Sequence, residues 1–236
     1  MSFHDAPNWL NENLFEEFLE KDFPNFLKIT KFNIKPAVST GENYMTIMLR
    51  VVINLQLKNN TTLATTYMVK IKPKPEKLRT MIREWKIFFK EHNTYTKYIP
   101  AFENYYRKAG CEIQLAPRLL EPTRCHIDDD YLILEDLGSR GFKNFNRHLG
   151  LDLKHTKAVL QKLAQFHAAS AQYYQENGSY HVLYDKSLSC EVDRFAVHRQ
   201  KMCDIFRENL RLYGNFEYLE SKLVSKKLTE GHWPTK

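Results

Sequence analysis

The chain has 236 residues, of which 43% are hydrophobic and 13% aromatic, so it can bury a sizeable core and is not globally disordered. Its 35 Lys and Arg against 28 Asp and Glu give a formal net charge of +7, which serves solubility or attracts an anionic partner. The sequence contains no run of about 18 apolar residues that could span a membrane. The first residues lack the basic and apolar regions of a secretory signal, so we expect a cytoplasmic protein.

The four cysteines are Cys111, Cys125, Cys190 and Cys203. They form no Cys-x-x-C pair and no zinc-ligand spacing with a histidine, which argues against a structural zinc site. A chain of this length does not need a disulfide scaffold, so free thiols in a reducing compartment are expected.

Hydrophobic periodicity predicts a β-rich first part and a helical second part. Apolar residues at helical spacing indicate a first helix over residues 9–20. Alternation and turn residues then predict strands over 27–36, 44–57 and 62–71, with a turn at 39–43. Helices are expected over 77–91 and 101–109, strands over 115–122 and 131–137, and further helices over 152–174, 191–213 and 216–228. The expected organisation is an α+β fold with a β-rich lobe over residues 1–137 and a mainly helical segment over 138–236.

Lys70 is the first candidate for chemistry, because it lies near the end of the third predicted strand between residues that favour burial. Glu84 falls inside the following helix, beside its apolar stripe. A strand lysine paired with a helix glutamate is how kinase-like folds direct an ammonium group at nucleotide phosphates. Both residues could equally be surface charges, because further cations crowd the same region: Lys72, Lys74, Lys77 and Arg79.

Two other segments could contact a nucleotide. The turn at 39–43 could cover phosphates, but its single glycine, Gly41, is a weak signal and also fits a plain hairpin. The strand that ends in Glu135 and Asp136 could offer backbone groups to an adenine edge, or it could be a core strand that ends in a solvated turn.

Two polar features are better explained by structure than by chemistry. His167 lies in a predicted helix near its apolar stripe, where a core histidine is more common than a catalytic base. The acidic run Asp128-Asp129-Asp130 lacks the alternating ligands and the glycine of a calcium loop, so we interpret it as a solvated turn.

The order of short motifs resembles the insect ecdysteroid kinase-like family, in the choline- and aminoglycoside-kinase-like branch of the protein-kinase-like fold. The resemblance runs from about Trp9 to the end. It rests on the following stretches: Gly41-Glu42-Asn43-Tyr44, Met48-Leu49-Arg50-Val51, Met68-Val69-Lys70, Glu84, Ile99-Pro100-Ala101-Phe102-Glu103, Tyr106-Arg107-Lys108-Ala109-Gly110, Leu134-Glu135-Asp136-Leu137, Gly141-Phe142, Gly150-Leu151-Asp152 and Leu163-Ala164-Gln165-Phe166-His167-Ala168-Ala169-Ser170.

The resemblance implies a protein-kinase-like fold, with an antiparallel five-stranded nucleotide-binding lobe, a hinge and a partial helical lobe. It implies that Lys70 contacts ATP phosphates with Glu84 as its partner, and that Gly41, Glu42 and Asn43 cover the phosphates. It also implies that Glu135, Asp136 and Leu137 form the hinge beside adenine. The implied reaction transfers the γ-phosphoryl group of ATP, with magnesium, to a hydroxyl of a small molecule such as a steroid.

The sequence departs from this family at the catalytic loop. No His-Gly-Asp occurs between Gly138 and Lys236, so the resemblance supplies no catalytic residue and no magnesium ligand. We therefore expect a truncated or inactive kinase-like chain that does not catalyse transfer by the usual route. A non-catalytic nucleotide-binding or regulatory module is the alternative, and a basic nucleic-acid-binding protein is the less favoured one, because no RNA-recognition or helix-turn-helix signature is present.

Overall fold

The computed structural model describes residues 6–38, 45–124, 127, 130–146, 148–185, 201–202, 204–206, 208–209, 212 and 217–218. The chain divides into two compact units, Met1–Leu183 and Tyr184–Lys236. The predicted lobe boundary after Leu137 stays a prediction.

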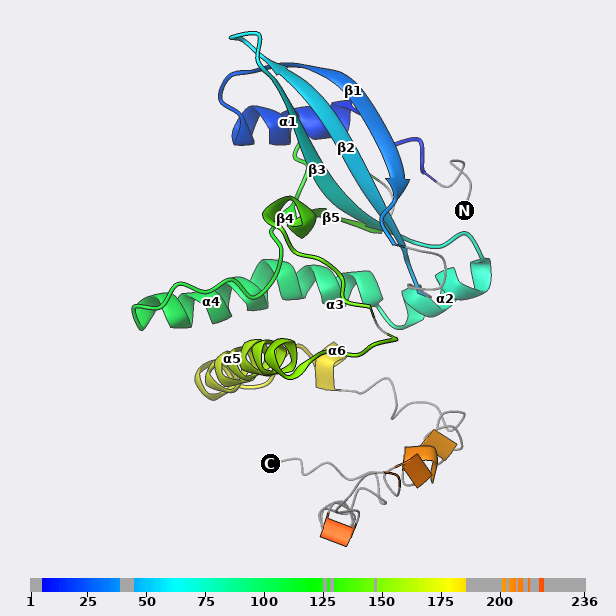
Figure 1. The fold of residues 1–236 in the computed structure, drawn as a ribbon, viewed down its shortest axis with the longest axis vertical. Helices are drawn as coiled ribbons and strands as arrows, with labels where there is room; N and C mark the ends of the chain where they lie inside the picture. The colour runs from blue at the N-terminus through cyan, green and yellow to red at the C-terminus, as the bar shows by residue number, and fades with distance from the viewer. Residues whose placement is uncertain are drawn as a thin grey trace. The chain divides into compact units, whose positions relative to one another are not determined.

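The first unit is built on one antiparallel sheet (Figure 1). Its strands follow the order β1-β2-β3-β5-β4, and each neighbouring pair is antiparallel. Their bounds are β1 (Phe26–Pro36), β2 (Ile47–Leu57), β3 (Thr62–Ile71), β4 (Leu119–Leu120) and β5 (Tyr131–Glu135). The predicted fold class, α+β with a five-stranded antiparallel sheet consistent with a kinase-like fold, is confirmed. The strand expected over 115–122 is wrong in its length, because only Leu119–Leu120 pair with β5.

One face of the sheet packs against helix α1 (Asn13–Asp22) (Figure 1). Side chains alternate between the two faces of a strand, so every second residue of β2 enters this core. The buried β2 residues are Ile47, Leu49, Val51, Ile53 and Leu55. Helix α1 contributes four buried residues, Leu14, Phe15, Phe18 and Leu19.

The other face carries two short helices, where the sequence predicts one long helix over 77–91. Helix α2 (Glu76–Glu84) ends at Trp85, and α3 (Ile87–Asn93) begins after Lys86. The long helix is interrupted because Lys86 adopts a left-handed conformation with φ of 52°, which an α-helix cannot include. Both helices still share one buried cluster with β5, formed by Ile82, Phe88, Leu132 and Leu134.

Aromatic rings join the helices that follow. The π-helical turn η2 (Thr94–Tyr98) leads into α4 (Ile99–Lys108), beside which α5 (Leu153–Asn177) lies (Figure 1). The Tyr98 ring lies 5.4 Å from that of Tyr173 in α5 and 5.0 Å from that of Tyr180. Tyr106 also donates a hydrogen bond to the Gln165 carbonyl at 3.0 Å. The start of the helical region is therefore packed onto the sheet-bearing part of the unit.

Helix α6 (Val182–Asp185) lies at the end of the continuous described range 148–185. In the second unit, the described residues 201–202, 204–206, 208–209 and 217–218 are helical, as predicted. Residues 191–200 and 219–228 of the expected helices lie outside the described residues. Of the helices in the described part of the chain, none is long and apolar enough to cross a membrane.

Candidate functional site

Lys70 occupies the sheet face that carries α2 and α3. In β3 its neighbours Val69 and Ile71 point into the α1 core, so alternation places the lysine on the opposite face. The register puts Lys70 between Met48 of β2 and Leu132 of β5, in the middle of the sheet. Its side chain is 19% exposed, which leaves the ammonium group partly desolvated.

The partner of Lys70 is Glu91 of α3. The ammonium Nζ donates to both carboxylate oxygens, at 2.8 Å to Oε1 and 2.6 Å to Oε2. Such a two-point contact between charged groups fixes direction as well as distance. The predicted pairing with Glu84 is wrong, because Glu84 ends α2 and is exposed, whereas the chain turns at Lys86 before α3 meets the sheet.

The spacing of α3 explains why Glu91 reaches the lysine. Residues three apart share a helix face, so Glu91 lies on the same face as Phe88. Phe88 is buried against Leu132, the β5 residue that pairs with Lys70. The sequence alone does not distinguish the two glutamates, because Glu84 and Glu91 lie four and three residues from Phe88 and would both share its face in one continuous helix.

Asp136 follows β5 and is only 4% exposed. Its Oδ2 lies 2.7 Å from Nε of Arg50 in β2, and its Oδ1 accepts from the Gly138 amide at 2.9 Å. Burial opposes ionisation, but the hydrogen bonds from Thr66 and Gly138 and the charge of Arg50 outweigh it, so the pKa of Asp136 is lowered. The carboxylate thus joins β2 and β3 to the segment that leaves the sheet.

The comparisons with known proteins give one family. Residues 40–229 match the family described as the ecdysteroid kinase-like family. The chain belongs to the ecdysteroid kinase-like family. The matched region includes β2, β3, α3 and β5, the elements that hold the Lys70–Glu91 and Arg50–Asp136 pairs. Neither the curated proteins nor the solved structures contain a match to the chain.

The segment that the ecdysteroid kinase-like resemblance makes the hinge is a tight turn. Leu137 begins the 3₁₀ turn η3 (Leu137–Arg140). The Asp136 carbonyl accepts from the Ser139 amide at 3.1 Å, and the Leu137 carbonyl accepts from the Phe142 amide at 3.2 Å. The backbone carbonyls of Asp136 and Leu137 therefore already accept hydrogen bonds from within this segment.

The Glu135 side chain holds the start of this turn in place through hydrogen bonds. Its carboxylate accepts from the Arg118 amide at 3.1 Å, from Gln114 at 3.2 Å and from Arg140 at 3.1 Å. Burial opposes ionisation, yet these donors together lower the pKa of Glu135. A side chain held in this way positions the strand end and has little freedom to reach a ligand.

Some of the other residues singled out in the sequence lie in the described part of the chain, and others lie outside it. Gly41, Glu42 and Asn43 lie outside the described residues, as do Asp128 and Asp129. Asp130 forms an ion pair with Lys72 at 3.0 Å. The interpretation of His167 as a core histidine is wrong, because it lies on an exposed face of α5.

In the part of the chain that the structure describes, no group of three or more His, Cys, Asp or Glu side chains could hold a metal ion.

Proposed function

We propose that this member of the ecdysteroid kinase-like family binds ATP on the sheet face that carries Lys70. We further propose that it serves the ATP-dependent transfer of a phosphoryl group to a hydroxyl of a small molecule. The family match supports a kinase-like protein with a nucleotide and a small-molecule substrate. The acceptor and the phosphoryl transfer itself are part of the proposal.

The observation that carries the proposal is the Lys70–Glu91 ion pair. A lysine that donates to two carboxylate oxygens at 2.6 and 2.8 Å has its ammonium group aimed in one direction. Kinase-like folds use such a strand lysine and helix glutamate to bind and neutralise nucleotide phosphates. Glu91 would therefore orient Lys70, and Lys70 would contact the phosphates.

The other contacts to ATP follow from the resemblance. The 135–137 turn, which Arg50 holds against β2 through Asp136, would lie beside the adenine. Gly41, Glu42 and Asn43 would cover the phosphates. Magnesium, when bound, would neutralise charge on the phosphate oxygens.

A second candidate is a nucleotide-binding or regulatory module without phosphoryl transfer. The observation that favours it is that the 236 residues contain no His-Gly-Asp, the motif expected to orient the acceptor hydroxyl. Both candidates share ATP binding at Lys70 and differ in whether product forms.

The test measures ATP binding by isothermal titration calorimetry with the full chain and magnesium. We expect wild type to bind ATP and Lys70→Met to lose at least most of this affinity. Lys31→Met is the matched control, because Lys31 is an exposed strand lysine in β1. Equal ATP affinity in wild type and Lys70→Met would overturn the proposal, as would the absence of binding in wild type.

A second measurement separates the two candidates. The full chain is incubated with γ-labelled ATP and a mixture of small hydroxyl compounds, including steroids. Label on an organic product that disappears in Lys70→Met supports phosphotransfer. Binding of ATP without any labelled product supports the non-catalytic module.

A further inference from the structure

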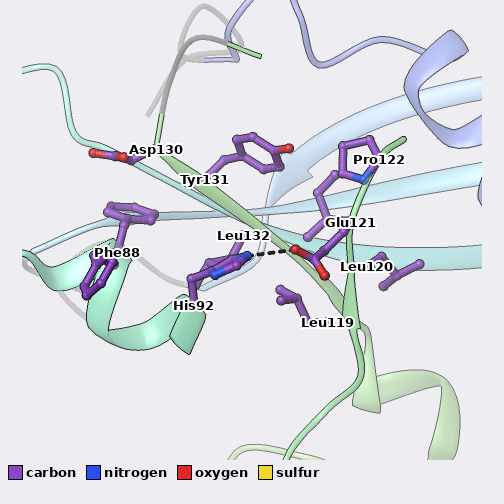
Figure 2. A pocket seen from close by; sticks show the side chains of 11 residues that line it. Phe88, His92, Leu119, Leu120, Glu121, Pro122, Asp130, Tyr131 and Leu132 are labelled. Atoms are coloured by element: carbon purple, nitrogen blue, oxygen red, sulfur yellow. Dashed lines mark hydrogen bonds and ion pairs between the residues drawn. The ribbon is translucent and has the colours of Figure 1, made fainter. Parts of the chain in front are cut away.

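A pocket of about 330 Å³ lies between α3 and the β4–β5 pair (Figure 2). None of Lys70, Glu91, Arg50 and Asp136 lines it, although Phe88 and Leu132 lie on the same face of the sheet as Lys70. Its walls come from α3, from β4 and the two residues after it, and from β5 and the residue before it. The lining residues are Phe88, Phe89, His92, Leu119, Leu120, Glu121, Pro122, Asp130, Tyr131, Leu132 and Ile133.

The inner wall of the pocket is apolar and well packed. Phe88, Leu120 and Leu132 are all less than a tenth exposed, which fixes the shape of this wall. Phe89 is 46% exposed and lies at the solvent side. Ligand sites in proteins commonly combine apolar walls of this kind with a few fixed polar groups, and the volume is at the small end of their range.

Four polar side chains line the pocket: His92, Glu121, Asp130 and Tyr131. Glu121 follows β4, and its Oε1 lies 2.8 Å from Nε2 of His92 in α3 (Figure 2). A carboxylate can accept hydrogen bonds at both oxygens, so this contact does not exhaust Glu121. The second carboxylate of the lining, Asp130, is already paired with Lys72 at 3.0 Å.

This combination of groups selects a cation. Glu121, whose side chain is 59% exposed, offers a negative charge beside aromatic and aliphatic walls, and the same charge would repel an anionic ligand. An aromatic ring of the ligand can stack against the phenylalanines, and its ammonium can reach Glu121.

We propose that this pocket is a second ligand site that binds a small amphipathic amine, with an apolar or aromatic body and one ammonium group. The apolar body packs on Phe88 and Leu132. The ammonium donates to Glu121, whose Oε1 also contacts His92. The site needs neither ATP nor Lys70, so its test is independent of the proposed kinase-like function.

The test uses tryptamine as the probe and indole-3-propionate as its anionic counterpart of similar size. Methyl NMR of the full chain with labelled leucines is recorded during titration with each compound. Tryptamine is expected to shift the methyl signals of Leu119, Leu120 and Leu132, and to leave those of Leu14 and Leu19 in the α1 core unchanged. Indole-3-propionate is expected to bind at least about tenfold more weakly, since it lacks the charge-assisted hydrogen bond to Glu121.

Two variants localise the charge effect. Glu121→Gln keeps the size of the side chain and its contact with His92, and is expected to weaken tryptamine binding about tenfold. Glu112→Gln is the matched control, because Glu112 is exposed and lies outside the pocket. Equal affinity for the cation and the anion, an unchanged affinity in Glu121→Gln, or shifts that miss all three pocket leucines would each overturn the proposal.

Discussion

Arg50 in the middle of β2 and Asp136 after β5 form an ion pair across the sheet, with Nε 2.7 Å from Oδ2. The two residues are 86 positions apart in the chain. Gly138 allows this arrangement, since a Cβ at that position would lie 3.0 Å from the Asp136 carboxylate. The pair therefore fixes the place at which the chain leaves the sheet, beside the face that carries Lys70.

Replacing Asp136 with asparagine tests this role through pH. The pKa of Asp136 is lower in the folded protein than the ordinary value of about 3.9, so ionised Asp136 stabilises the fold above that pH. The contribution is lost as pH falls further, through the lowered pKa of the folded state. We expect Asp136→Asn to cost about 1 to 3 kcal/mol at pH 7 and less at pH 3, which lies below the ordinary pKa.

Urea unfolding followed by circular dichroism at both pH values measures this difference. Glu112→Gln, which removes an exposed carboxylate, is the control and should change little at either pH. An equal loss of stability for Asp136→Asn at pH 7 and pH 3 would show that the ion pair is not the cause.

A second prediction separates the two glutamates that flank the turn at Lys86. Glu91→Gln leaves Lys70 without a charged partner, so we expect ATP affinity to fall about tenfold, as for a lost charge-assisted hydrogen bond. Glu84→Gln is expected to leave affinity unchanged, because Glu84 is exposed at the end of α2. Calorimetry on both variants decides which glutamate orients the lysine, and a larger effect of Glu84→Gln would contradict the assignment.

The same pair can be examined without ATP by a double-mutant cycle. Lys70→Met and Glu91→Gln remove opposite ends of one contact, so their effects on the free energy of unfolding should not add. Lys70→Met and Glu84→Gln should add. Additive effects for both combinations would show that the ion pair does not contribute to stability.

The sheet could be predicted from the sequence because its signals are local. Alternating burial in β2 and β3 follows directly from alternating apolar residues, and β3 (Thr62–Ile71) has the bounds that the pattern predicts. The short β4 could not be predicted in the same way. Leu119 and Leu120 are flanked by Pro117-Arg118 and Glu121-Pro122, and only pairing with β5 determines that these two residues join the sheet.

The break between α2 and α3 could not be read from periodicity. Ile82 and Phe88 enter the same buried cluster from either side of the break, so the apolar spacing continues as if one helix were present. Lys86 has no intrinsic preference for a left-handed conformation, so its identity gives no warning. The same break hides Glu91 as the partner of Lys70, whereas the position of Lys70 in a strand follows from the apolar residues on either side of it.

Phe15 is predicted to be a main source of stability for the first unit. Its side chain is fully buried, and its ring lies 5.2 Å from Tyr67, 5.7 Å from Phe32 and 6.1 Å from Phe18. Phe15→Ala removes a ring from a close-packed core, which costs about 3 to 5 kcal/mol. Urea unfolding measures the loss, and Leu27→Ala, at a residue that is 50% exposed, should cost far less.

Tyr67 offers a test of the same core at high pH. Burial, with a smaller effect from the charge of Asp22, raises the pKa of Tyr67 to about 12. The folded state therefore holds this proton more tightly than the unfolded chain, whose tyrosines ionise at about 10. Stability from the protonated phenol is complete below pH of about 10 and is lost as pH rises toward about 12.

Absorbance at the tyrosinate band should show one late-ionising tyrosine fewer in Tyr67→Phe than in wild type. Burial also raises the pKa of Tyr95 to about 12, so a late component persists in that variant. An unchanged late amplitude in Tyr67→Phe would mean that water reaches the phenol and that α1 does not seal this side of the sheet.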